Sequence, residues 1–452
     1  MSYPTRRVED DAIPPSSSLY RAVWRWHFYA GLLVLPFMIL LACTGGLYLF
    51  KDEINGLIYH SYLTVAPADT APLAASDLIA KATAAVPGGA VRYVPAADPT
   101  GSVEVGIETA DRGTLSVYVD PYRGTVLGTI ADSAKLMFII KKIHSLDYFG
   151  WITNRIIEIV AGWAIILVIT GFYLWWPRSR VAGVWTMRLR PGRRVFWRDL
   201  HVVTGAYVGL LIFFLAITGL PWSGFWGAKL NHFVDSNGLG YPPEYWESVP
   251  KSQVPMGHEM HQVNWTLENA PMPESTETGA SPIGIDKALA IFDGLGVTKG
   301  YTVDLPSGPE GVYSASIFPD QVANERVVHL DQYTGKPLFD GGFEALGVGA
   351  KAIEWGISVH QGQEYGRFNQ FLMLATCLSI ILMAVSAIAM WWNRRPKGSL
   401  GAPRTPENYR IAKGIIAIAV AVGVLFPLVG GSLLAMLAID RLLPSPLRRR
   451  FA

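Results

Sequence analysis

The chain has 452 residues, of which 50% are hydrophobic and only 16% are charged, and its formal net charge is +2 at pH 7. With 15 tryptophans besides, this composition excludes an ordinary soluble enzyme and is typical of a membrane protein with several spans. The two cysteines, Cys43 and Cys377, exclude a disulfide framework, a zinc-ligand spacing and a Cys-x-x-Cys-His haem attachment.

Apolar stretches long enough to cross a bilayer recur five times along the chain. They predict this order: cytoplasmic N-terminus 1–23, first span 24–51, outer module 52–143, second span 152–177, basic loop 178–198, third span 199–222, second outer module with an insertion 223–359, fourth span 368–393, loop 394–413, fifth span or re-entrant segment 414–440, and tail 441–452. The predicted fold class is a mainly α membrane protein. Duplicated units of helix, outer α+β module and helix form a four-helix transmembrane core, and a fifth membrane helix follows at the C-terminal end.

The first span ends near a loose match to a lipoprotein cleavage site, Leu40 to Cys43. The apolar run continues to Leu49, beyond the cysteine, and a related sequence recurs in the middle of the chain. We therefore predict an uncleaved span.

Basic residues predict the orientation, because they concentrate on the cytoplasmic side of a membrane. Segment 178–198 contains seven arginines and no acidic residue, and segment 394–413 is also basic. We expect both segments and the N-terminus to be cytoplasmic, with both modules outside. A fifth span would place Arg448–Arg450 outside, so this segment either violates the rule or re-enters at Pro427.

The two modules have the same expected plan. In the first, a helix at 77–85 precedes strands at 103–107 and 115–119 and a turn at 120–124. In the second, a helix opens at Gly284, followed by strands at 311–317 and 326–330 and a turn at 331–335.

The recurrence extends to chemically distinctive residues and indicates a tandem duplication. His27 and His201, like Thr44 and Thr218, are 174 residues apart, while 216 residues separate His144 from His360 and 211 separate Asp120 from Asp331.

The four duplicated histidines are candidate axial ligands of haem iron. Low-spin haem takes two imidazoles, and helices of a bundle can each direct one histidine at a shared porphyrin. The duplication pairs His27 with His201 and His144 with His360, which predicts two haem b groups, one near each membrane face. Gly31 and Gly205, one helical turn beyond their histidines, would leave room for the macrocycle. A single histidine at a membrane interface is more often not a metal ligand. Here, however, both copies of the duplicated unit have a histidine at both positions.

Helix geometry limits how close the two predicted haems could be. Residues 144–176 as one straight helix would span roughly 48 Å, which would place the outer haem far from the inner one. Three alternatives follow: the helix proper begins near Thr153, with His144 on a bent segment before it; His27 lies deeper than its sequence position suggests; or aromatic side chains such as Trp163 lie between the haems.

Other histidines compete for a metal-binding role. We expect His60 and His232 to be surface residues. Met256, His258, Met260 and His261 contain soft ligands suited to copper, although a mobile cap with adaptable methionine contacts is the favoured interpretation. The Gly347-Val348-Gly349 segment lacks a preceding strand pattern and is not interpreted as a dinucleotide-binding loop.

Taken together, several motifs resemble the PepSY-associated transmembrane proteins, whose members include di-haem ferric-siderophore reductases of the bacterial inner membrane. The matching motifs cover roughly residues 20–400. They are the histidine before Gly31, Val119 to Gly124, His144 followed by Trp-Trp-Pro-Arg, Arg-Asp-Leu-His ending at His201, and His360 followed by Trp-Trp-Asn-Arg-Arg-Pro. The resemblance implies a haem b electron carrier with PepSY-like modules and, in some members, reduction of chelated iron.

The expected partners follow from this electron-transfer role. We predict an oxidoreductase that receives electrons from a separate cytoplasmic flavin- or NAD(P)H-linked donor and reduces a ferric siderophore or other iron chelate at the outer face. Lipid is the remaining partner, and no nucleic acid is expected. One-electron transfer needs no catalytic nucleophile or acid–base pair. The alternatives are a haem-free binding or uptake protein and a quinol-linked cytochrome b. The arginines of 178–198 serve topology and headgroup binding, or dock an acidic redox partner.

Overall fold

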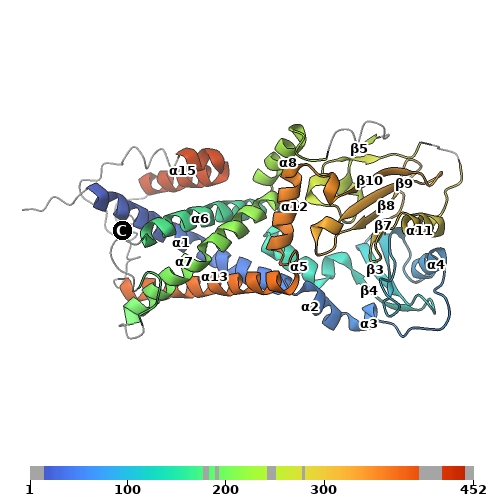
Figure 1. Cartoon of the computed structure of the whole chain (residues 1–452), viewed down its shortest axis with the longest axis horizontal. Helices are drawn as coiled ribbons and strands as arrows, with labels where there is room; N and C mark the ends of the chain where they lie inside the picture. Colours follow the sequence, from blue (N-terminus) through green and yellow to red (C-terminus); the bar gives the residue numbers. More distant parts are fainter. Residues whose placement is uncertain are drawn as a thin grey trace, which may run out of the picture. The chain divides into compact units, whose positions relative to one another are not determined.

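The computed structural model describes residues 15–176, 183–188, 193–241, 251–276, 280–395 and 420–442. The chain divides into two compact units, whose elements are labelled in Figure 1. The helical unit comprises Met1–Cys43, Arg155–Ile217 and Thr376–Ala452, and the sheet unit comprises Thr44–Asn154 and Thr218–Ala375. Each unit therefore draws on both halves of the duplicated sequence.

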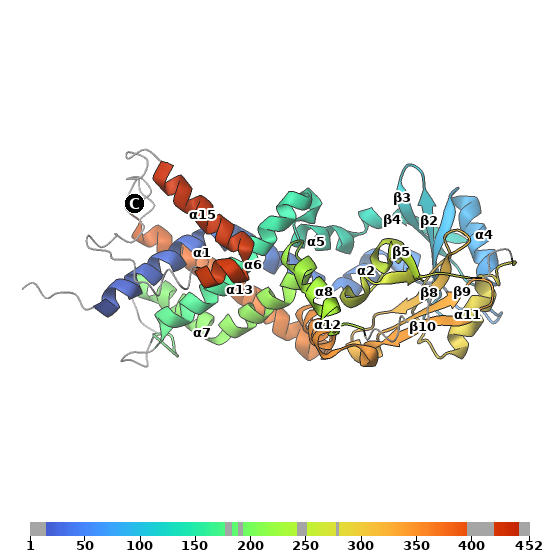
Figure 2. The same cartoon turned by 90° about the horizontal axis from the view of Figure 1, so that it is seen from above.

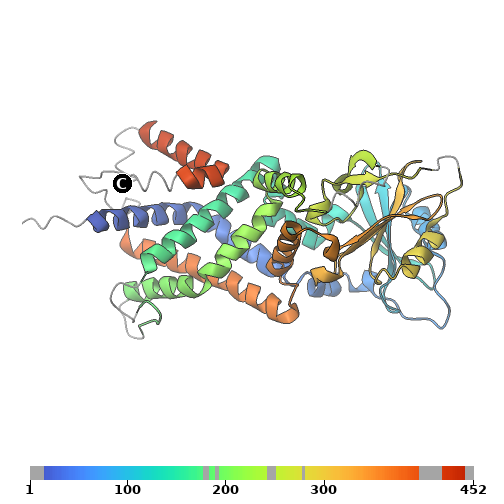
Figure 3. The ribbon, with the colours of Figure 1, turned by 45° about the horizontal axis from the view of Figure 1, so that its top comes forward.

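Four long apolar helices supply the helical unit and run alongside one another (Figure 3). They are α1 (Pro15–Tyr48), α6 (Trp151–Trp175), α7 (Arg193–Gly219) and α13 (Gly366–Arg394). Each is long and apolar enough to cross a membrane. The structure therefore has a long apolar helix at four of the five predicted spans.

The side chains of these helices indicate which surfaces face lipid. Ile212 on α7 packs with Ala42 on α1 and Cys377 on α13 in a buried cluster. Leu210, two residues before Ile212 and therefore on the opposite side of α7, is 71% exposed. Exposed aliphatic side chains of this kind are expected where the surrounding solvent is hydrocarbon rather than water.

Several predicted boundaries shift in the structure. The first helix already begins at Pro15, so part of the predicted N-terminal tail is helical. The third begins at Arg193, which makes the end of the predicted basic loop helical as well. Within that loop, Arg188 donates two hydrogen bonds to the fully buried carboxylate of Asp199, so this arginine has a structural role. Residues 177–182, 189–192, 396–419 and 443–452 of the predicted loops, fifth span and tail lie outside the described residues.

The predicted fifth span is broken where it is described. Residues 420–425 are helical, and α15 (Pro427–Leu442) follows after a break at Phe426. A Cβ on Gly430 would lie 2.7 Å from the Cα of Gly423, so the two helical segments pack closely at a sharp bend. The described part of α15 is too short to count among the spanning helices. The break falls at Pro427, where the sequence indicated a re-entrant turn.

The sheet unit contains one eight-stranded antiparallel sheet rather than two separate small ones. Its strand order is β10-β9-β8-β7-β1-β2-β3-β4. The strands are β1 (Gly89–Val94), β2 (Val103–Thr109), β3 (Gly113–Val119), β4 (Val126–Ala131), β7 (Thr302–Asp304), β8 (Val312–Ile317), β9 (Arg326–Asp331) and β10 (Pro337–Gly342). The two predicted strands of each module are confirmed as β2, β3, β8 and β9, and the other four were not predicted.

The two homologous halves join through their first strands. Arg92 on β1 pairs with Asp304 on β7, and Tyr93 pairs with Val303. Each half alone would expose the backbone groups of β1 or β7 at a sheet edge, and mutual pairing satisfies both edges. The duplication thus produces one continuous sheet.

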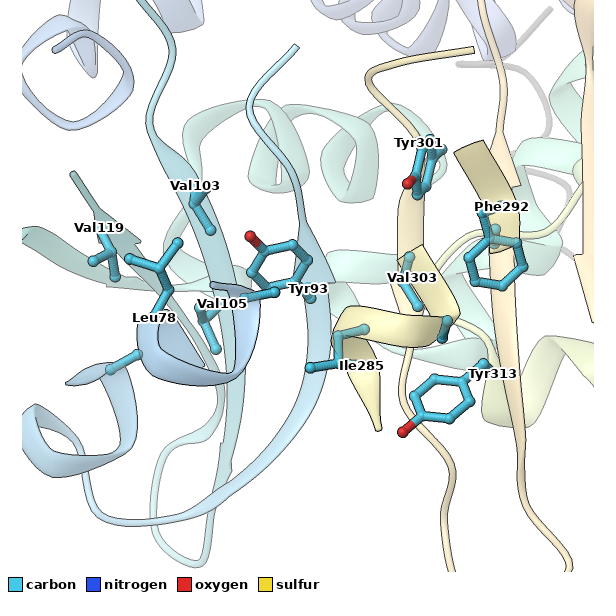
Figure 4. Close-up of a cluster of buried hydrophobic side chains, with 14 of the residues drawn as sticks. Leu78, Tyr93, Val103, Val105, Val119, Ile285, Phe292, Tyr301, Val303 and Tyr313 are labelled. Atoms are coloured by element: carbon cyan, nitrogen blue, oxygen red, sulfur yellow. The ribbon is translucent and has the colours of Figure 1, made fainter. Parts of the chain in front are cut away.

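Helices α4 (Ala75–Ala85) and α11 (Ile285–Gly294) cover one face of the sheet (Figure 2). Leu78 and Ala82 on α4 are four residues apart, lie on one side of the helix and are buried. Phe292 on α11 packs in the same core as Val105 and Tyr301 (Figure 4). Both predicted module helices are therefore confirmed, and they share one hydrophobic core.

The opposite face of the second half packs against the insertion and two helices. The helices are α8 (Trp226–Ser236) and α12 (Val348–His360), and the insertion contains β5 (Lys251–Pro255), α10 (Met256–Glu259) and β6 (Pro271–Pro273), with β5 and β6 forming a second small sheet. Buried side chains of α8, α10, β6 and α12 contribute to a second core. Other described α-helices of the unit are α2 (Lys51–Ile58), α3 (His60–Leu63) and α5 (Leu136–His144).

Both predicted turns have the same hydrogen-bond design. Asp120 accepts hydrogen bonds from the backbone N–H groups of the residues two and three positions later, and Asp331 does the same in the second half. Gly124 and Gly335 follow with positive φ angles of 66° and 73°, which favour glycine. This repeated detail supports the duplication at the level of local structure.

Candidate functional site

The first predicted histidine pair comes together inside the helical unit. His27 on α1 and His201 on α7 have ring centroids 6.4 Å apart and ring planes at 87°. The two rings therefore approach one another from different helices, as the sequence predicted.

Hydrogen bonds define which nitrogen of each ring carries the proton. His27 Nδ1 is 2.9 Å from Thr170 Oγ1, and that hydroxyl donates its own proton to the carbonyl of Ile166. While the Thr170 hydroxyl proton is engaged with that carbonyl, Nδ1 of His27 is the donor of the 2.9 Å hydrogen bond. His201 Nδ1 is 3.1 Å from the carbonyl oxygen of Met383, which only accepts. Both Nε2 atoms therefore retain a lone pair, which is the form of histidine that binds metals.

The second predicted pair comes together in the sheet unit. His144 ends α5 and His360 ends α12, and their ring centroids are 6.5 Å apart with ring planes at 89°. Thr44 Oγ1 lies 2.8 Å from His144 Nδ1, and Thr218 Oγ1 lies 2.9 Å from His360 Nδ1. Burial lowers the pKa of His144 to about 4 and so favours the neutral ring. The duplicated threonines thus orient the duplicated histidines in the same way.

The structure also resolves how His144 relates to the second long helix. A left-handed residue, Leu146, and Gly150 separate the end of α5 at His144 from the start of α6 at Trp151. Of the alternatives given by the sequence, the bent segment before a later helix start is therefore confirmed. A continuous helix of roughly 48 Å is not formed.

The glycines near the rings differ from those predicted. A Cβ on Gly205 would meet Met383 Cε at 3.2 Å, and one on Gly31 would meet only Leu167, at 3.9 Å. The glycines that approach an imidazole are Gly171, 3.3 Å from His27 Cε1, and Gly219, 3.5 Å from His360 Cε1. The predicted role of Gly31 and Gly205 in leaving room for a macrocycle stays a prediction, because the contacts of a Cβ at these positions do not test it.

The competing histidines do not form a site with one another. His60 and His232 are exposed, as predicted. Met256 and Met260 are buried in the second core of the sheet unit, whereas His258 is exposed. Over the described ranges no group of three or more His, Cys, Asp or Glu residues could hold a metal ion. The two methionines of this segment are therefore core residues of the sheet unit rather than adaptable contacts of a mobile cap. Gly347, at the start of α12, lies so close to the backbone of Leu239 that a Cβ would clash, which gives this glycine a packing role.

A buried charged cluster in the sheet unit had no counterpart in the sequence analysis. Arg92 is 1% exposed and donates hydrogen bonds to Glu104 at 2.7 Å, to Asp132 at 3.0 Å and to Nδ1 of His261 at 2.7 Å. The backbone N–H of His261 in turn donates to Asp304 Oδ1 at 3.2 Å. No sequence pattern marked Arg92, because its strand was not predicted and its partners come from distant segments.

Asp304 is expected to make the stability of the sheet unit depend on pH. Burial raises its pKa to about 7, against the hydrogen bond from His261 and the charge of Arg92. Between pH ~4 and pH ~7 the folded protein holds a proton on Asp304 that the unfolded chain has released. The stabilisation of the folded state by this proton is complete below pH ~4 and is lost as the pH rises to ~7. The total loss in the free energy of unfolding is about 4 kcal/mol. Asp304→Asn should remove most of this dependence. Thermal unfolding at pH 5 and pH 8 measures it, and an unchanged difference between the two pH values in the variant would contradict the assignment.

Four apolar helices, an internal duplication and one histidine pair in each unit define a membrane protein built from two homologous halves. The model of the PepSY-associated TM region matches residues 24–394, most of the chain, and the chain belongs to this family. The matched segment includes all four paired histidines, so the resemblance drawn from the motifs is confirmed. No curated protein matches the chain.

Proposed function

We propose that the two histidine pairs hold two haem b groups and that the protein passes electrons across the bacterial inner membrane. His27 with His201 would ligate one haem, and His144 with His360 the other. Two metal–imidazole bonds of about 2 Å each, plus the distance from each nitrogen to its ring centre, give a centroid separation in the observed range. The observation that carries this proposal is the repetition of one ring arrangement at two places in the chain.

The residues around the rings fit such a group. A ligand set of two imidazoles is sufficient for low-spin haem, so the absence of larger ligand clusters among the described residues does not bear on it. Hydrogen bonds to Thr170 and to the carbonyl of Met383 engage Nδ1 of His27 and of His201, which leaves Nε2 of each ring as the nitrogen available to iron. Haem b supplies reversible one-electron transfer, and the protein's contribution is ligation, burial and these hydrogen bonds.

The proposed direction of electron flow follows from the expected topology. A cytoplasmic flavin- or NAD(P)H-linked donor would reduce the helical unit from the basic side, and a ferric siderophore or related iron chelate would accept electrons from the sheet unit at the outer face. The protein would then be an oxidoreductase acting on chelated ferric iron.

Purification tests this proposal directly. The full chain in neutral detergent should show a Soret band, a low-spin b-type spectrum and two haems per chain by pyridine haemochrome assay. The reduced protein should be reoxidised by a ferric chelate faster than by the iron-free chelator. A colourless protein would support the haem-free binding or uptake function instead. Haem reduction that requires quinol would support the quinol-linked cytochrome b.

A further inference from the structure

A cavity of about 150 Å³ lies in the sheet unit between the small β5–β6 sheet and the ends of β7 and β8. Four carboxylate residues line it: Asp304, Glu259, Glu274 and Glu310. Apolar groups, including Met272 and Val312, line it as well. We call this cavity the acidic pocket. Among the described residues that line it, there is no lysine or arginine.

Asp304 distinguishes the acidic pocket from a solvated acidic surface. Its side chain is only 7% exposed. One carboxylate oxygen, Oδ1, accepts the backbone N–H of His261, whereas the buried Oδ2 has no hydrogen-bond partner. A buried polar atom without a partner costs free energy unless something pairs with it. The nearby guanidinium of Arg92 is already bound to Glu104 and Asp132.

We propose that the acidic pocket binds a small aliphatic amine, whose ammonium group pairs with the buried carboxylate of Asp304. Glu274, half-buried in the wall, and the exposed Glu259 and Glu310 add negative charge around the opening. Met272 and Val312 provide contacts for the methylene groups of such a ligand. The site is independent of the proposed haem groups.

Size and charge favour an organic cation over a metal ion. An engineered cavity of about 150 Å³ accommodates benzene, so the acidic pocket has room for a ligand of about six heavy atoms. Protein-bound Ca²⁺ takes six to eight oxygen ligands at about 2.3–2.6 Å. In the part of the chain that the structure describes, no three carboxylates are placed to converge on one ion in this way. An ammonium group can pair with a single carboxylate, so carboxylates that do not converge on one point are sufficient for a short amine.

The test uses 1,4-diaminobutane, which has six heavy atoms and two ammonium groups. Isothermal titration of the full chain in neutral detergent should show saturable binding to one site, and neutral 1,4-butanediol should show none. Asp304→Asn should weaken binding at least tenfold. Glu274→Gln, a milder change at the wall, should weaken it several-fold.

The matched control is Glu108→Gln, which neutralises an exposed carboxylate on β2 of the same unit. This variant should bind the diamine with unchanged affinity. The proposal is overturned if the wild type shows no saturable binding, if Glu108→Gln weakens binding as much as the pocket variants do, or if Mg²⁺ or Ca²⁺ displaces the diamine at lower concentration than the diamine itself requires.

Proton linkage gives a second readout of the same contact. The ionisable groups that face Asp304 or line the pocket are Arg92, His261, Glu259, Glu274 and Glu310. Because burial raises the pKa of Asp304 to about 7, the diamine must displace a proton below that pH. Affinity should therefore increase severalfold from pH 6 to pH 8. In Asp304→Asn this increase should disappear, and an equal increase in the variant would assign the linkage to another group.

Discussion

Replacing His360 by alanine is expected to lower the haem content of the purified protein from two per chain to about one. His360 and His144 approach one another at 6.5 Å between ring centroids, and Thr218 orients His360 through Nδ1. Without one of the two imidazoles, the proposed haem between His144 and His360 would lose an iron ligand, which would weaken its binding and change its spin state. The pyridine haemochrome assay gives the ratio, and the remaining spectrum should be low-spin.

Double variants make the pairing itself testable. His144→Ala combined with His360→Ala should still retain one haem, because both changes fall on one proposed site. His27→Ala combined with His360→Ala should retain almost none. The matched controls, His60→Ala and His232→Ala, replace exposed histidines of the same sheet unit and should keep both haems. Full retention of both haems after His360→Ala would show that the pairing is wrong.

The sequence predicted the histidine pairs because the signal was duplicated and chemically specific. Two independent copies kept histidine at the same two positions, and the structure brings each predicted pair together. The hydrogen-bond partners of these histidines could not be predicted from the sequence in the same way. Thr44 and Thr218 were recognised as repeated residues without a role, and Thr170 lies on a helix whose rotation the sequence does not define.

The long apolar helices were predicted well, whereas the sheet was predicted only in part. Length and hydropathy are local properties, so α1, α6, α7 and α13 could be identified from single segments. The joining of β1 to β7 is a non-local pairing between residues about 210 positions apart in the chain, and β7 has only three residues. Such short strands carry little alternation in hydropathy. The single sheet, and with it the charged cluster and the acidic pocket, therefore became visible only in the structure.

Replacing Arg92 by alanine is expected to destabilise the sheet unit by about 3–5 kcal/mol, because removing one partner of a buried ion pair leaves the other charges uncompensated. Arg92 is 1% exposed, and its guanidinium pairs with both Glu104 and Asp132. At about 2–4 °C per kcal/mol for a unit of this size, the apparent melting temperature should fall by about 10 °C. Differential scanning fluorimetry of the purified protein measures the change.

Arg326→Ala is the matched control, since Arg326 also makes two hydrogen bonds to one carboxylate, Asp340, but both side chains are about one third exposed. Solvent screening limits such a pair to about 0–1 kcal/mol.

The pH dependence of the Arg92→Ala effect separates the loss of the charge interaction from the loss of packing. The guanidinium of Arg92 and the ammonium of Lys135 outweigh burial and hold the pKa values of Glu104 and Asp132 below their usual range. Their stabilisation is therefore present above pH ~4 and is lost as pH falls through the lowered values. The difference between wild type and Arg92→Ala should shrink on acidification, and a difference that stays constant down to pH 3 would assign the effect to packing instead.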